Sequence, residues 1–290
     1  MATPIIVRIV QSSKKGKCSN KPECFYFYLE LCHKVDIKPE NLLYKYYPYN
    51  EYLLEMLITK KAWFSKPETF NDPFDCHLNF DNNIPQNKYE KCLRWQLKRE
   101  GRSQSQIEND IRNLISQDGI VNDKAKKVID EIGASTLDVI KNIGVYCLSD
   151  VNSNMTMWAY YADNHRGLCL GFLISEDVVP WKVSYVAEAP KVNFSELFDD
   201  ESTENEYKWI FSKHHDWQNE NEWRIVAPQG NKLWPIPGEI KTVTFGLRMD
   251  KFKRKVVQQI LQNEYNIEYF EAIRNQELLR LNVRKIGTDT

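Results

Sequence analysis

The tripeptide Glu220-Asn221-Glu222 places two carboxylates two residues apart. Side chains alternate between the two faces of a strand, so an extended segment here would point both carboxylates to the same side. Two carboxylates in one pocket repel each other, which raises the pKa of one of them and creates an acid–base or cation-stabilising pair. Arg224 continues the same face. Two alternatives without a catalytic role are an ion pair between Arg224 and Glu222 that only supports the fold, and a strand edge exposed to solvent.

A second group of residues suited to chemistry lies within residues 157–167. Tyr160 and Tyr161 are followed by His165, whose imidazole can act as a general base or bind a ligand hydroxyl or carbonyl. Trp158, like other tryptophans of this chain, can stack on a flat ring such as nicotinamide or adenine. The structural alternatives are a hydrogen-bonded loop histidine and a core tryptophan.

Other residues that commonly carry chemistry are arranged less favourably. His214-His215-Asp216 suggests a metal ligand set, but adjacent side chains on a strand point in opposite directions, which argues against a shared ion. The cysteines and histidine within residues 18–33 fit no familiar zinc-finger spacing. Ser149 lacks the GxSxG pattern of a hydrolase nucleophile. We therefore expect no metal site and no hydrolase triad.

Strands and one short helix are predicted to position the two groups. Residues 144–149 and 168–174 are apolar and rich in strand-forming residues, so each predicts a strand. Apolar residues at helical spacing predict a short helix over residues 155–162, followed by a polar loop over residues 163–167. Residues 222–226 alternate charged and apolar side chains, which predicts a further strand.

The remaining elements mix helices and strands without regular alternation. The predicted strands are residues 42–47, 62–65, 181–186, 240–245 and 267–272, and the predicted helices are residues 51–58, 204–213 and 251–264. Residues 66–76 form an ordered turn, in which Asn71 and Asp72 can accept from local backbone donors. No glycine-rich turn follows a strand, which argues against a Rossmann or P-loop fold.

The chain divides by composition into three parts. Residues 86–142 are charged and glutamine-rich, with apolar residues at helical spacing, and predict a helical insertion. We place this insertion within a main domain of residues 41–290 and treat residues 1–40 as an N-terminal appendage. The predicted fold class is α+β, in a single domain with a mostly antiparallel sheet.

Composition excludes several broad classes of protein. The 290 residues include 42% hydrophobic and 12% aromatic residues, which is typical of a globular chain. The formal net charge of −1 gives no overall basic field to attract nucleic acid or an anionic membrane. No apolar run approaches the roughly 20 residues that span a bilayer, and residues 1–10 lack a signal-peptide pattern. We therefore expect a cytoplasmic protein with reduced cysteines and no membrane partner.

Five motifs together resemble a known family. They are LYKY (residues 43–46), WFSKPETFNDPFDC (63–76), VYCLSD (145–150), MWAYYADNHRGLCLGF (157–172) and KHHDWQNENEWRIV (213–226). In this order they resemble the bacterial family catalogued as domain of unknown function 2971, over roughly residues 41–290. The layout of the motifs is similar to that of ADP-ribosyltransferases, which implies a split sheet and the use of NAD as a substrate.

The resemblance implies a role for each matching residue. Lys45 would take the early basic position, where Arg or His is commoner, and Tyr160 or Tyr161 would stack on nicotinamide. Glu222 would bind the ribose and stabilise the oxocarbenium-like transition state, because a fixed carboxylate offsets positive charge on the sugar. Glu220 would orient or deprotonate the acceptor.

The same resemblance assigns further residues to the cleft. Tyr161 and His165 join Glu220 and Glu222 as catalytic residues. The residues assigned to NAD binding are Lys45, Tyr46, Ser65, Asn71, Asp72, Trp158 and Tyr160. The acceptor would be an unknown nucleic acid or protein, and the setting would be a bacterial toxin or a phage-defence effector.

Two other functions remain open from the sequence. A binding module for nucleic acid or a partner protein would use the basic residues of the last helix, which are Lys251, Lys253, Arg254 and Lys255. A metal-dependent nuclease would use four acidic residues, which are Asp72, Asp75, Glu220 and Glu222.

Overall fold

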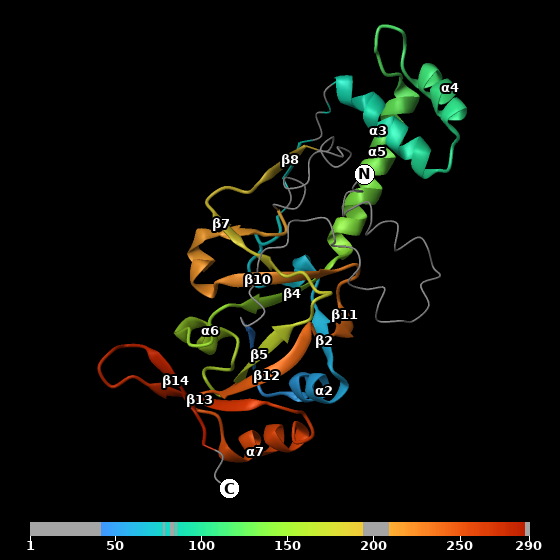
Figure 1. The fold of residues 1–290 in the computed structure, drawn as a ribbon. Helices are drawn as coiled ribbons and strands as arrows, with labels where there is room; N and C mark the ends of the chain where they lie inside the picture. Colours follow the sequence, from blue (N-terminus) through green and yellow to red (C-terminus); the bar gives the residue numbers. More distant parts are fainter. Residues whose placement is uncertain (1–41, 78, 82–83, 85, 194–208, 288–290) are drawn as a thin grey trace. The chain divides into compact units, whose positions relative to one another are not determined.

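The computed structural model describes residues 42–77, 79–81, 84, 86–193 and 209–287 (Figure 1). The chain divides into two compact units. The first comprises residues 1–32, 66–143 and 186–212, and the second comprises residues 33–65, 144–185 and 213–290. The N-terminal appendage predicted over residues 1–40 lies outside the described residues.

An eight-stranded sheet forms the body of the second unit. Its strand order is β14-β13-β12-β5-β1-β4-β10-β6. The strands are β1 (Leu43–Tyr47), β4 (Gly144–Ser149), β5 (Leu168–Ile174), β6 (Trp181–Lys182), β10 (Glu222–Ala227), β12 (Gly238–Phe245), β13 (Glu268–Arg274) and β14 (Leu281–Lys285). Neighbours in this sheet are antiparallel, except that β12 and β13 run parallel. The predicted mixed α+β class with a large, mostly antiparallel sheet is therefore confirmed.

Helix α6 (Met155–Tyr160) covers one face of this sheet. Its Trp158 is fully buried and meets the Tyr46 ring edge-on, with 5.2 Å between ring centroids. The strand register pairs Tyr44 with Ser149 and Ser149 with Glu222, so these three side chains share one face. Tyr46, two residues from Tyr44, lies on that face as well. Helix α6 and Glu222 therefore occupy the same side of the sheet.

Helix α7 (Lys251–Ile260) packs on the opposite face. The Arg254 guanidinium lies 5.6 Å from the centroid of the Phe245 ring and donates to the Glu271 carboxylate at 3.1 Å. The register pairs Phe245 with Glu271, so the two lie on one face of the sheet. Helix α2 (Glu51–Thr59), capped by Asn50 as predicted, contacts α7.

Strands β1 and β4, in the middle of the sheet, are paired over a very short length. Within the described strands, β1 and β4 are in register at one residue pair, Tyr44 with Ser149. Lys45 Nζ donates to the backbone oxygen of Cys147 at 2.7 Å, and the hydroxyls of Tyr47 and Tyr146 are hydrogen-bonded at 2.5 Å. The Lys45 ammonium thus satisfies a backbone oxygen of β4 that strand pairing could otherwise satisfy.

The structure also contains several shorter elements. Strand β2 (Lys61–Phe64) pairs with β11 (Lys232–Pro235), and β7 (Ser184–Val186) pairs with β9 (Ser212–His214). The 3-10 helix η6 (His215–Glu220) connects β9 to β10. A helix was predicted over residues 204–213, but residues 209–211 form a turn and residues 212–213 belong to β9, so this part of the prediction was wrong.

The first unit contains the helices predicted over residues 86–142. They are α3 (Gln86–Arg99), α4 (Gln104–Leu114) and α5 (Asp123–Asn142). Helix α4 begins with a capping box in which Ser103 and Gln106 satisfy each other's backbone donors. The unit also holds the 3-10 turn η3 (Pro67–Thr69) and the paired strands β3 (Asn79–Asp81) and β8 (Lys191–Asn193). No helix among the described residues is both long enough and apolar enough to cross a membrane.

Gly167 provides a test of how tightly β5 is fitted beside β1. A Cβ at this position would lie 2.0 Å from the backbone oxygen of Tyr47, which cannot move without disturbing the sheet. We expect Gly167→Ala to lower the free energy of unfolding by about 1–3 kcal/mol, measured by urea denaturation. Gly287→Ala is the control, because nothing lies within 4 Å of its Cβ. Equal stability of the two variants would contradict this packing.

Candidate functional site

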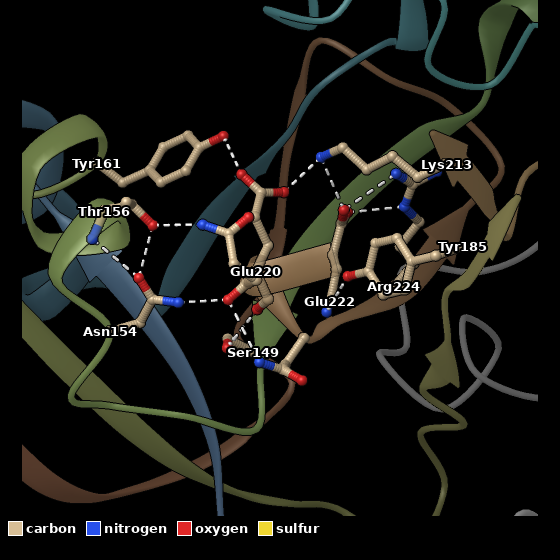
Figure 2. A network of polar contacts seen from close by, with 11 residues as sticks. Ser149, Asn154, Thr156, Tyr161, Tyr185, Lys213, Glu220, Glu222 and Arg224 are labelled. Atoms are coloured by element: carbon tan, nitrogen blue, oxygen red, sulfur yellow. Dashed lines mark hydrogen bonds and ion pairs between the residues drawn. The ribbon is translucent and has the colours of Figure 1, made fainter. Parts of the chain in front are cut away.

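The ammonium group of Lys213 joins the two carboxylates of the ExE motif. Lys213 Nζ lies 2.5 Å from Glu220 Oε2 and 3.0 Å from Glu222 Oε2. All three side chains are at most 5% exposed. Figure 2 shows the ammonium reaching both carboxylates. The sequence correctly indicated that the two carboxylates act as a pair, but did not identify the cation between them.

Arg224 supplies the second positive charge. Its Nε donates to Glu222 Oε1 at 2.7 Å and its Nη2 donates to Glu222 Oε2 at 3.2 Å, so the contact is bidentate. The Arg224 side chain is fully buried. Two cations and two carboxylates therefore form a buried cluster whose formal charges cancel, which we call the Lys213 cluster (Lys213, Glu220, Glu222 and Arg224).

The cluster keeps Glu222 ionised. Burial by itself raises the pKa of this carboxyl, but the charges of Arg224 and Lys213, with hydrogen bonds from Arg224 and Cys147, outweigh it and lower the pKa to about 2. The sequence predicted mutual repulsion and a raised pKa for one of the pair. The pKa of Glu222 is instead lowered, and the alternative ion pair between Arg224 and Glu222 is confirmed. An ionised, fixed carboxylate is suited to stabilising positive charge.

Glu220 reaches the cluster from a turn, and not from the strand that carries Glu222. It is the last residue of η6, Asn221 has a left-handed backbone with φ 47°, and β10 begins at Glu222. The predicted alternation along a strand is therefore not what brings the carboxylates together. The left-handed residue turns the chain, and asparagine tolerates this conformation better than most residues.

The end of η6 is tied to the chain around α6. Ser149 Oγ donates to the backbone oxygen of Glu220 at 2.6 Å, and Asn154, the cap of α6, donates to the backbone oxygen of Asn219. Asn219 in turn donates to Thr156 Oγ1 at 2.5 Å. These bonds fix the backbone that presents Glu220.

Tyr161 connects α6 directly to the carboxylates. Its hydroxyl donates to Glu220 Oε1 at 2.7 Å, so Glu220 accepts from Tyr161 through one oxygen and pairs with Lys213 through the other. Lys213 Nζ also lies 4.9 Å from the centroid of the Trp217 ring, in cation–π contact. Of the residues predicted to be catalytic, the structure brings Tyr161, Glu220 and Glu222 into one network.

Lys45 approaches this network from the other side of the sheet. The register places Lys45 on the face opposite Glu222, and its ammonium donates to the backbone oxygen of Cys147 in β4. Loss of solvation lowers the pKa of Lys45, and this is partly offset by Cys147 and by the nearby carboxylates of Glu222 and Glu220. The ammonium of Lys45 therefore interacts electrostatically with both carboxylates.

His165 occupies a strained loop. Asp163, Asn164 and His165 have φ values of 45°, 52° and 69°, all in the left-handed region. The His165 ring is stacked over Trp158 with 6.4 Å between centroids, and its buried Nδ1 has no hydrogen-bond partner among the described residues. Burial and the charge of Arg248 lower the pKa of His165. Its described contacts lie at Trp158 and Arg248, and not in the Lys213 cluster.

Other residues assigned to NAD binding have structural contacts. Trp158 donates from its indole to the backbone oxygen of Asn152, and Tyr46 donates to the backbone oxygen of Val151, both deep in the core. Ser65 is bonded through its backbone to Val145. Tyr160 is 70% exposed and meets Tyr161 edge-on.

Asn71 and Asp72 belong to the first unit. Asn71 is exposed, whereas Asp72 is buried and its Oδ1 accepts from the backbone of Phe74, as the predicted turn requires. The nuclease alternative drew Asp72 and Asp75 together with Glu220 and Glu222. Those two glutamates already bind Lys213, and Glu222 also binds Arg224, so cations of the chain occupy the positions that a metal would take.

Some of the basic side chains of helix α7 make contacts within the fold. Arg254 binds Glu271 and the backbone oxygens of Gly246 and Met249, and Lys253 lies 4.9 Å from the centroid of the Tyr49 ring. Lys251 and Lys255 are exposed. The four residues thus divide into two that hold the helix and two that face solvent.

Lys213 is the functional candidate that the sequence did not single out. It was assigned to the end of a helix, and it stands seven residues before Glu220. The available signal was the carboxylate pair itself, because two glutamates predicted on one buried face require cations. Lys213 and Arg224 flank that pair within the motif KHHDWQNENEWRIV.

Lys213→Met tests whether the ammonium holds the cluster together. The variant leaves two buried carboxylates without their shared cation, so we expect the free energy of unfolding to fall by about 3–5 kcal/mol in chemical denaturation. Lys182→Met is the matched control, because Lys182 forms an exposed bridge with Asp150 at 3.1 Å. It should cost less than about 1 kcal/mol. A similar loss in both variants would contradict a central role for Lys213.

The depressed pKa of Glu222 makes stability depend on pH. Its pKa is about 2 in the folded chain against an ordinary 4.5, so its stabilising effect is present above pH 4.5 and is lost as pH falls towards 2. Between wild type and Glu222→Gln, the difference in unfolding free energy should shrink by about 3 kcal/mol over that range. Urea denaturation at a series of pH values measures it, with the exposed Glu239→Gln as control. A difference that stays constant with pH would refute the assignment.

Of three comparisons with known proteins, one gives a match. A search of curated proteins and a search of solved structures each give no match. The matched family segment contains Tyr161, Lys213, Glu220, Glu222 and Arg224. The resemblance is confirmed over residues 157–225, which match the model of the family described as "Protein of unknown function (DUF2971)" and hold the motif of residues 157–172 and nearly all of the motif of residues 213–226.

Proposed function

We propose that this chain cleaves the bond between nicotinamide and ribose in NAD and transfers ADP-ribose to an acceptor or to water. The observation that carries the proposal is the convergence of Glu220 and Glu222 on one ammonium group, with Tyr161 bonded to Glu220 and with Glu222 ionised. A fixed carboxylate with a low pKa is the group that such a reaction needs opposite its developing sugar cation.

The proposed reaction balances as a substitution at the anomeric carbon. The bond from ribose C1′ to the nicotinamide nitrogen breaks, and its electron pair leaves with nicotinamide. Glu222 stabilises the resulting positive charge on the sugar. An acceptor hydroxyl, amine or water forms the new bond to C1′, and its proton passes to Glu220, whose orientation Tyr161 fixes.

Lys213 has a defined part in this proposal. Without substrate, the ammonium of Lys213 forms ion pairs with both carboxylates and neutralises part of their negative charge. The sugar cation would take over that electrostatic role in the transition state, once the substrate displaces the ammonium. Lys213 thereby helps to keep Glu222 ionised until NAD binds.

Nicotinamide release from NAD tests the proposed activity. The purified full chain is incubated with NAD, alone and with nucleic-acid and protein acceptors, and nicotinamide and labelled ADP-ribose are quantified. We expect Glu222→Gln to lower the rate at least about 100-fold, because it removes the charge opposite the sugar cation.

Two further variants separate chemistry from folding. Tyr161→Phe deletes one hydroxyl at the edge of the Lys213 cluster and should lower the rate while the urea midpoint changes little. Glu239→Gln, on an exposed side chain, should leave the rate unchanged. No nicotinamide release from the folded wild-type chain with any acceptor would overturn the proposal.

A further inference from the structure

His214, His215 and Asp216 converge at the start of η6, outside the Lys213 cluster. The sequence suggested that these adjacent side chains diverge, as they would on a strand. Strand β9 ends at His214, and His215 and Asp216 already belong to the 3-10 turn. The turn brings one potential ligand atom from each residue within 4.8 Å of the others.

The distances match those between ligands of a single small metal ion. His214 Nδ1 lies 3.2 Å from Asp216 Oδ2, and His215 Nε2 lies 3.4 Å from Asp216 Oδ1. Zinc binds nitrogen and oxygen at about 2.0–2.1 Å in tetrahedral sites, which separates its ligands by about 3.3 Å. The two imidazole rings lie side by side, tilted by 42° with 4.1 Å between centroids.

The position of His214 Nδ1 also suits a metal ligand. It lies 3.4 Å from the backbone nitrogen of Asp216, from which it accepts a long hydrogen bond that caps η6. The same nitrogen lies 3.2 Å from Asp216 Oδ2. Because an imidazole nitrogen has one lone pair, a metal ion bound through Nδ1 would replace this long hydrogen bond and take the Asp216 carboxylate as a neighbouring ligand.

We propose that His214, His215 and Asp216 form a binding site for a transition-metal ion of the zinc class. Two imidazoles and one carboxylate are the donors that such ions prefer, whereas magnesium and calcium favour oxygen ligands throughout. Three protein ligands leave the fourth tetrahedral position open for water or another ligand. The inference does not depend on the proposed NAD chemistry.

The position of this site links it to the cluster. Lys213 directly precedes His214, and Glu220 ends the 3-10 helix that His215 begins. A metal bound across residues 214–216 ties the first turn of η6 to the end of β9. It thereby stabilises the segment that presents Lys213 and Glu220, and the metal-bound chain is expected to unfold at a higher temperature than the metal-free chain.

Calorimetric titration of the metal-free full chain with ZnCl2 tests the site. We expect one zinc per chain, little response to MgCl2, and a higher thermal midpoint with zinc. His215→Ala and Asp216→Asn should each weaken zinc binding at least 10-fold and abolish the thermal shift. Both side chains are more than half exposed, so neither variant should unfold the metal-free protein.

His77→Ala is the matched control, because His77 is exposed and lies in the first unit. It should bind zinc as the wild type does. No zinc binding by the wild type would overturn the proposal. Binding that persists unchanged in both His215→Ala and Asp216→Asn would also overturn it and assign the ion to other ligands, such as the cysteines of residues 18–33.

Discussion

The contact of one lysine ammonium with two buried carboxylates is the constraint on which this region depends. Removing an isolated charge from water costs several kcal/mol, so each member of the Lys213 cluster is acceptable only with its partners present. Lys213 ends up on β9, Glu220 on η6 and Glu222 on β10, all within ten residues of chain. Strand β9, the turn η6 and strand β10 must therefore form together. The hydrogen bond from Tyr161 to Glu220 attaches the end of α6 to the same cluster.

The cluster also sets the chemistry that the region can support. Its formal charges cancel, yet both carboxylates face one point at which positive charge is favourable. An ammonium satisfies that point at rest, and a sugar cation would satisfy it during NAD cleavage. The histidine-rich turn that starts η6 lies directly beside it in the chain, so a bound metal would act on the same segment without taking part in the carboxylate pair.

Local patterns predicted most elements, whereas long-range pairing decided the site. Apolar strands 144–149 and 168–174 and the Asn50-capped helix were predictable because alternation, spacing and capping are local properties. The pairing of Glu220 with Glu222 was predicted for the wrong reason, since a left-handed Asn221, not strand alternation, directs Glu220. Lys213 and the placement of Lys45 on the opposite face depend on strand register and a turn, which no short window contains.

The ionisation of Glu222 inside the folded chain tests the central claim most directly. Carbon-13 NMR of glutamate-labelled protein, with Glu222→Gln to assign the signal, follows the side-chain carboxyl as the pH is lowered. The account predicts that Glu222 keeps the chemical shift of an ionised carboxylate well below pH 4.5 and titrates towards a pKa of about 2. A midpoint at or above 4.5 would show two repelling carboxylates without effective counter-ions, and would contradict the cluster as described.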